Sequence, residues 1–185
     1  MTWVFPVKYT LVPTSDSESF RTMPTGKTGL PLPPHPGAFG VQRKKHVHEG
    51  IDLYMPQDAP VFAVEAGEVL AVRLFTGPAL GHDWWLPTHG VWVAGASGVV
   101  VYGEILPHVK VGQRVNAGEM IGAVMRVLKT DKGRPTSMLH LELRAPGDTT
   151  DIEWLDISNR PPTLRDPTPL LLESIECPLS GYTGT

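Results

Sequence analysis

Alternation of apolar and polar residues, the pattern of a half-buried β-strand, recurs in short stretches between residues 37 and 147. In the clearest stretch, 138–143, leucines occupy positions 139, 141 and 143, while Met138, His140 and Glu142 fall on the opposite face. Residues 61–73 predict two short strands joined as a hairpin around 65–67. Residues 90–94 and 98–102 predict a second hairpin, and glycine-punctuated apolar runs predict more strands in 109–124. We therefore expect a mainly β fold built on an antiparallel sheet.

Helical periodicity is limited to stretches of about two turns, so few short helices are expected. The best candidate is 170–175, with Thr168 as its cap and Pro169 in its first turn. Seven prolines before residue 37 deny that region a helix or a central strand. Residues 1–36 are therefore predicted to be an arm, in which 3–7 add an edge strand and 26–37 form a loop. The β core then covers 37–147, and 148–185 form a C-terminal extension with the short helix and a mobile tail.

Composition fits one ordinary domain of 185 residues, because 41% of them are hydrophobic and 19% charged. The 19 glycines and 19 prolines favour short strands and turns over long helices. Lone Cys177 excludes an intramolecular disulfide and a cysteine-based zinc cluster.

Charge and hydropathy narrow the partners that we expect. A net charge of −3 gives no electrostatic reason for nucleic acid or an anionic membrane as a partner. No apolar run approaches the ~18 residues of a membrane span, and the first residues lack the pattern of a secretory signal. A cytoplasmic location, a virion and export by a signal-independent route all stay open, and nothing in the sequence predicts an oligomeric state.

Two distant segments carry the candidate chemistry. His48 and Asp52 are four residues apart, and in a strand this even spacing would place both side chains on one face. His140 lies in the alternating stretch described above, with Glu142 on its face. Two imidazoles and one carboxylate suit an open zinc site whose fourth position is left for water. Since no thiolate is involved, we expect one Zn²⁺ bound by His48, Asp52 and His140.

Five motifs, in order, resemble the lysostaphin-like and LytM-type zinc metallopeptidases of the M23 peptidase family, over about residues 37 to 145. They are Phe-Gly-Val-Gln-Arg at 39–43, His-x-Gly-Ile-Asp at 48–52, Pro-x-x-Ala-Pro-Val at 56–61, Val-x-Val-Gly-x-x-Val at 109–115 and Leu-His-Leu-Glu at 139–142. The resemblance implies an antiparallel sheet with a groove, zinc held by the three residues named above, and a peptidoglycan peptide or another peptide as substrate. Typical members cleave cross-links of the bacterial cell wall, for which a zinc-activated water would serve here.

Two positions depart from the family pattern. Met138 stands where the family has the first histidine of His-x-His, and Tyr102-Gly103-Glu104-Ile105 stands where it has Tyr-x-His-Leu. Glu104 is our candidate general base, because carboxylates do this work beside zinc-bound water in other enzymes. The alternatives for Glu104 are a carboxylate that orients a ligand histidine and a plain surface residue. Glu142, Met138 and Arg43 are predicted to contact the ligands or to line the groove.

Several residues have interpretations that the sequence leaves open. His46 is expected in an exposed approach to the site, and two further histidines, at 89 and 108, in loops. Trp84, Trp85 and Trp92 would either form the floor of a substrate groove or simply pack in the interior.

Two other functions compete with that of a peptidase. One is a catalytically degenerate, zinc-stabilised module that binds cell wall or a protein partner, favoured by the loss of both family histidines. The other is a biotinyl or lipoyl carrier, suggested by the glycine-punctuated stretch 109–124, although the required lysine at a hairpin tip is missing.

Overall fold

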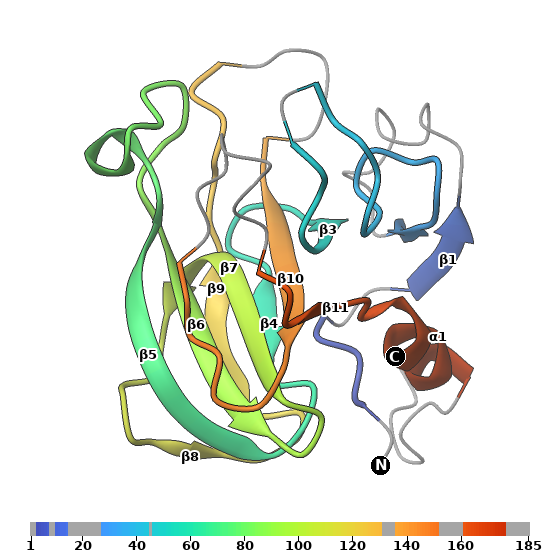
Figure 1. Ribbon diagram of the computed structural model, residues 1–185, viewed down its shortest axis with the longest axis vertical. Coiled ribbons are helices and arrows are strands. Elements are labelled where there is room, and N and C mark those ends of the chain that lie inside the picture. Colours follow the sequence, from blue (N-terminus) through green and yellow to red (C-terminus); the bar gives the residue numbers. More distant parts are fainter. Residues whose placement is uncertain are drawn as a thin grey trace.

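The computed structural model describes residues 3–7, 10–14, 27–44, 46–130, 136–151 and 161–176. Its main feature is an antiparallel sheet of nine strands (Figure 1). The strands are β3 (Ile51–Tyr54), β4 (Pro60–Phe62), β5 (Gly67–Thr76), β6 (Thr88–Gly95), β7 (Val99–Pro107), β8 (Arg114–Val115), β9 (Met120–Val124), β10 (Met138–Arg144) and β11 (Leu164–Arg165). The predicted fold class, mainly antiparallel β, is confirmed.

Strand pairing follows the order β11-β10-β7-β6-β5-β8, while β3 pairs with β10, and β9 pairs with both β7 and β4. The hairpin predicted around 95–98 is confirmed as β6 and β7, which are longer than expected. The hairpin predicted within 61–73 is wrong, because β4 pairs with β9 and β5 pairs with β6 and β8. Backbone bonds from Ala63 N to Glu119 O and from Gly118 N to Ala63 O continue the β4–β9 pairing. A local turn pattern locates the strands but does not choose their partners.

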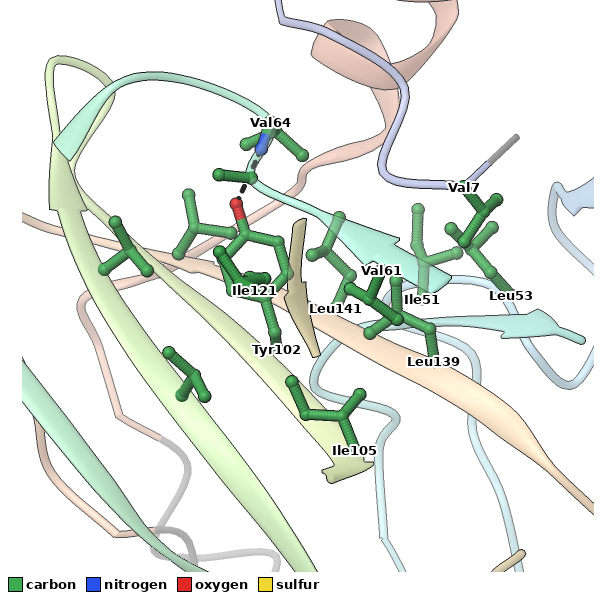
Figure 2. Packing of buried hydrophobic residues seen from close by; sticks show 14 of the residues in the cluster. Val7, Ile51, Leu53, Val61, Val64, Tyr102, Ile105, Ile121, Leu139 and Leu141 are labelled. Atoms are coloured by element: carbon green, nitrogen blue, oxygen red, sulfur yellow. Dashed lines mark hydrogen bonds between the residues drawn. The ribbon is translucent and has the colours of Figure 1, made fainter. Parts of the chain in front are cut away.

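The main core lies on the leucine face of β10. Leu139, Leu141 and Leu143 are buried there together with Ile51 and Leu53 from β3, and Figure 2 shows part of this cluster. Tyr102 is also buried in it, and its hydroxyl accepts a hydrogen bond of 2.8 Å from the Val64 backbone N–H (Figure 2). The opposite face of the sheet carries a smaller apolar cluster of Phe75, Trp92, Val99 and Val101. Alternation along β10 and β3 therefore sends His140, Glu142 and Asp52 away from the main core.

The N-terminal arm contributes to this core. Trp3, Val7 and Leu30 are buried in the main cluster. Residues 3–7 are not a strand, although Val4 N donates to Val64 O and Pro6 O accepts from Phe62 N. The predicted loop 26–37 is wrong at its start, since β2 (Lys27–Pro31) pairs in parallel with β1 (Thr10–Thr14). These two strands form their own small sheet, and a two-stranded sheet has only edge strands, the strands in which proline is tolerated.

The predicted C-terminal helix is present as α1 (Thr168–Glu176), and a short 3₁₀ helix, η2 (Pro78–Leu80), follows β5. Asp166 rather than Thr168 supplies the capping oxygen, because its Oδ1 accepts the Thr168 backbone N–H at 2.8 Å. Leu171 buries the helix against the main core. In the ranges described above, no helix has the length and apolar character needed to cross a membrane. The predicted tail at 177–185 and most of the polar loop at 129–136 lie outside those ranges.

Candidate metal centre

The structure brings the three predicted ligands together from two separate segments. Asp52 on β3 is paired directly opposite His140 on β10, so the two side chains share a face of the sheet. His48 is not in a strand, contrary to the expectation that it shares a strand face with Asp52. The neighbouring loop holds it instead through the backbone. The His48 backbone N–H donates to Val41 O, and the His48 backbone carbonyl accepts from Gly40 N.

The ligand atoms form a small, buried triangle. His48 Nε2 lies 3.1 Å from Asp52 Oδ1, His140 Nδ1 lies 2.9 Å from the same oxygen, and the two nitrogens are 3.4 Å apart. Zinc ligands at about 2.0–2.2 Å in a tetrahedron lie roughly 3.3 Å from one another, which matches this triangle. Among the described histidines, cysteines and acids, these three form the only group of at least three whose ligand atoms lie within 4.8 Å of one another.

Each imidazole is oriented by its second ring nitrogen. His48 Nδ1 lies 2.9 Å from the Ala38 carbonyl oxygen, to which it donates, so Nε2 keeps a lone pair. His140 Nε2 lies 3.1 Å from Glu142 Oε1 and donates to it, which leaves the His140 Nδ1 lone pair for a ligand. Hydrogen bonds of this kind fix the tautomer of metal-binding histidines and raise their basicity.

The carboxylates around the triangle are paired with arginines. The Arg43 guanidinium binds Asp52 Oδ2, and Arg43 Nε donates to Pro36 O at 2.9 Å. Arg144 donates to Glu142 Oε2 from Nε at 2.8 Å and from Nη2 at 2.5 Å. Arg43 and Glu142 thus lie beside the three predicted ligands, and their role in orienting a metal site stays a prediction. Arg144 was missed, although it continues the same-face series after positions 140 and 142.

Met138 and two glycines complete the surroundings of His140. Met138 is half-buried at the start of β10, on the face of His140. A Cβ added to Gly50 would lie 2.8 Å from His140 Nε2, and one added to Gly103 would lie 2.3 Å from the Phe75 ring. That ring packs on the imidazole of His140 with centroids 5.6 Å apart. Both glycines are therefore required by the close packing around this ligand.

In the metal-free site, the surrounding charges and burial favour one proton held between His140 and Asp52. Burial lowers the pKa of His48 to about 4, so this imidazole is neutral. Burial also opposes protonation of His140, but hydrogen bonds to Asp52 and Glu142 raise its pKa to about 10. Burial of Asp52 acts against its ionisation, yet the charge of Arg43 and the contacts with the two histidines hold the pKa of this carboxyl well below its usual range. A metal ion bound at the three ligand atoms would therefore displace a proton from His140.

A β-bulge aims Glu104 at this site. Between the pairs Val91–Tyr102 and His89–Ile105, β7 has one residue more than β6. Glu104 takes a left-handed backbone conformation there, with φ of 67°. Because Tyr102 and Ile105 both point into the main core (Figure 2), the extra residue turns Glu104 toward the face of His140.

Glu104 is buried, which makes the surface interpretation wrong. Glu104 is only 7% exposed, and its Oε2 has no hydrogen-bond partner among the residues that the structure describes. Burial first, and then the negative charge of Asp52, raise the pKa of Glu104 to about 8. The carboxyl thus faces the ligand group and titrates near neutral pH.

Other expectations around the site need correction. His46 is not exposed but half-buried, with Nε2 3.9 Å from Glu49 Oε2. Sequence reasoning missed Glu49, whose pKa burial raises to about 7. His89 lies in β6 rather than in a loop. Trp92 is 1% exposed and packs on Phe75, so it cannot form a groove floor.

Two aromatic residues keep their open interpretation. Trp84 is 41% exposed and Trp85 is half-buried, with ring centroids 5.8 Å apart in the connection between β5 and β6. Their role as a substrate surface stays a prediction.

Comparison with known proteins identifies the family. The family model described as peptidase family M23 matches residues 46–152, which is more than half of the chain and includes all three predicted ligands. The chain belongs to peptidase family M23. The family resemblance seen in the sequence is thereby confirmed. No significant match to a curated protein was found for this M23 chain.

Solved structures with a similar fold come from bacterial peptidases. The catalytic domain of the antimicrobial peptidase lysostaphin from Staphylococcus simulans has a TM-score of 0.50 and 20% identity, over 74% of this M23 chain and 87% of that domain. A second structure, described as the antimicrobial peptidase lysostaphin from Staphylococcus simulans, has a TM-score of 0.54 and 20% identity, over 80% of this chain and 53% of the other. At this identity the likeness establishes the shared fold.

Proposed function

We propose that this chain is a zinc metallo-endopeptidase that cleaves peptide cross-links of bacterial peptidoglycan. The observation that carries the proposal is the buried triangle of His48 Nε2, Asp52 Oδ1 and His140 Nδ1, whose edges of 2.9 to 3.4 Å suit tetrahedral zinc. No fourth acid, histidine or cysteine joins this group among the described residues. Three protein ligands with an open position are the arrangement of catalytic rather than structural zinc sites.

Zinc in this site would act as a Lewis acid that polarises the peptide carbonyl and lowers the pKa of water to about 7. Asp52 and the two histidines would hold the ion, and Arg43 and Glu142 would keep these ligands oriented. Glu104 would accept a proton as the water oxygen adds to the carbonyl carbon, and would return it to the amine nitrogen as the C–N bond breaks. Its pKa is about 8 in the metal-free site, and the positive charge of bound zinc would lower it toward the working pH, where a general base is most effective.

Metal content and wall digestion, measured on the same preparations, test the proposal. The wild-type protein should hold one zinc per chain and release soluble peptides from purified peptidoglycan, and a chelator should abolish the release. His48→Ala should lose the zinc, whereas Glu104→Gln should keep it and lose most of the hydrolysis. Glu173→Gln, on the exposed side of α1, is the matched control and should behave as wild type. An unchanged zinc content in His48→Ala would show that the ligands are wrongly assigned.

A second candidate is a zinc-stabilised binding module without peptidase activity. The observation in its favour is that Met138 and Glu104 occupy the regions where the family resemblance implies histidines. Under this alternative, zinc content and its loss in His48→Ala are unchanged, but wild type and Glu104→Gln are equally unable to digest peptidoglycan. Sedimentation of the zinc-loaded protein with intact walls would then reveal binding without cleavage.

A further inference from the structure

A line of buried polar side chains leads from His140 into the protein along one face of β10. Residues 140, 142 and 144 alternate with the three leucines of the main core, so all three point to the opposite face. Glu142 is 0% exposed and Arg144 is 1% exposed. A carboxylate and a guanidinium this deeply buried are stable only when their charges and hydrogen bonds are satisfied by each other.

The contacts divide the Glu142 carboxylate between two partners. Oε2 takes both Arg144 donors, at 2.8 and 2.5 Å, while Oε1 lies 3.1 Å from His140 Nε2. Two charged donors that converge on one carboxylate oxygen hold that oxygen in place, so the second oxygen is the one left to face His140. Arg144 thereby determines that Oε1 points at the imidazole, which in turn sets the direction of the His140 Nδ1 lone pair.

Arg144 is itself held from its far side. Its Nη1 donates to the carbonyl oxygen of Thr150, which lies beyond the predicted end of the core at 147. The Thr150 backbone N–H donates to Asp148 Oδ1 at 2.9 Å, and the Thr163 hydroxyl donates to the other oxygen of Asp148. The guanidinium is therefore clamped between Glu142 and a folded segment that the strand alone does not supply.

We propose that Arg144 is a positioning residue for the metal centre, which acts on the ligand His140 through Glu142. The proposal rests on the zinc site proposed above, but its test separates the two. Arg73 offers a matched control, because it anchors the same segment through Thr149 O and Asp151, at 3.2 Å from the latter. Its guanidinium stacks 4.3 Å from the Trp92 ring centroid rather than on Glu142.

Zinc affinity is measured by competition with a chromophoric chelator, on the wild-type chain of 185 residues and on five variants. The variants are Arg144→Met, Arg144→Lys, Glu142→Gln, Arg73→Met and the double variant of Arg144→Met with Glu142→Gln. We expect Arg144→Met to weaken zinc binding by about 10- to 100-fold, as loss of a partner behind a ligand commonly does. Arg144→Lys, which keeps the charge without the two converging donors, should recover part of the affinity. Arg73→Met should stay within about 2-fold of wild type, because the contacts that orient His140 are intact in it.

The double variant distinguishes action through Glu142 from general damage. If Arg144 works only by orienting that carboxylate, Arg144→Met adds little once Glu142→Gln is present, whereas independent effects would multiply. Removing both buried charges together also leaves no unpaired ion, so this variant should fold even if a single variant does not. Multiplying effects, or a zinc affinity of Arg144→Met equal to that of wild type, would overturn the proposal.

A second readout needs no metal. The His140 Nε2–H proton, shielded by its hydrogen bond to Glu142, should give a slowly exchanging downfield NMR signal in wild type and Arg73→Met that is lost in Arg144→Met. If wild type binds no zinc but this pattern holds, the zinc site is wrong while the positioning role stands. If zinc binds and the signal persists in Arg144→Met, the positioning role is wrong while the zinc site stands.

Discussion

Replacing Glu104 with glutamine should stabilise the metal-free protein at neutral and higher pH. The pKa of this carboxyl rises from 4.5 to about 8 on folding, chiefly because the group is buried. Between these two pH values the unfolded chain has released the proton that the folded chain still holds. Stability therefore falls as pH rises through this window, since the folded state binds more protons. The interval of about 3.5 pH units corresponds to a loss on the order of 5 kcal/mol, at about 1.4 kcal/mol per unit.

Glutamine has nearly the same shape as glutamate and no charge to bury, so Glu104→Gln removes this pH-dependent loss of folding stability. Urea unfolding of chelator-treated wild type and Glu104→Gln, at pH 5, 6, 7 and 8, should give similar free energies at pH 5 and a growing advantage of the variant above it. The other titrating groups are common to both proteins, so the difference between the two curves reports Glu104 together with its interactions with Asp52 and His140. Glu173→Gln, changed at an exposed site, should track wild type throughout. Parallel curves for wild type and Glu104→Gln at all four pH values would refute the reasoning.

Three further outcomes follow from the site. Zinc binding near pH 6 should release about one proton, because the His140 pKa near 10 keeps this ligand protonated without metal, while a zinc-bound water with a pKa of about 7 keeps its proton at this pH. Calorimetry in buffers of different ionisation enthalpy would measure the release. If zinc binding released no proton, His140 would not be protonated in the metal-free protein. Gly103→Ala should cost about 1–3 kcal/mol in thermal or urea unfolding, since its Cβ would lie 2.3 Å from Phe75, and Phe75→Leu in the same chain should recover part of that cost. Met138→His, which restores an imidazole on the face of His140, should raise the rate of peptidoglycan digestion over wild type without changing zinc content.

Local periodicity determined much of this protein. Strand alternation is a property of the backbone, so placing the leucines of 138–143 in the core necessarily put His140 and Glu142 on the other face. The order of short motifs was enough to indicate the family. In these stretches the alternation and the motifs each involve only a few neighbouring residues, so they can be recognised without knowing which distant residues lie nearby.

Tertiary structure decided what depends on distant partners. The choice of β9 rather than β5 as the neighbour of β4 required the whole sheet. Alternation alone would have pointed Glu104 into the main core beside Tyr102, and the extra residue in β7 reversed its direction. The pairing of Arg43 with Asp52 and of Arg144 with Glu142 likewise depends on how buried charges are balanced across strands and loops. Such balances are set by packing in three dimensions, where a shift of one residue in register changes which side chains meet.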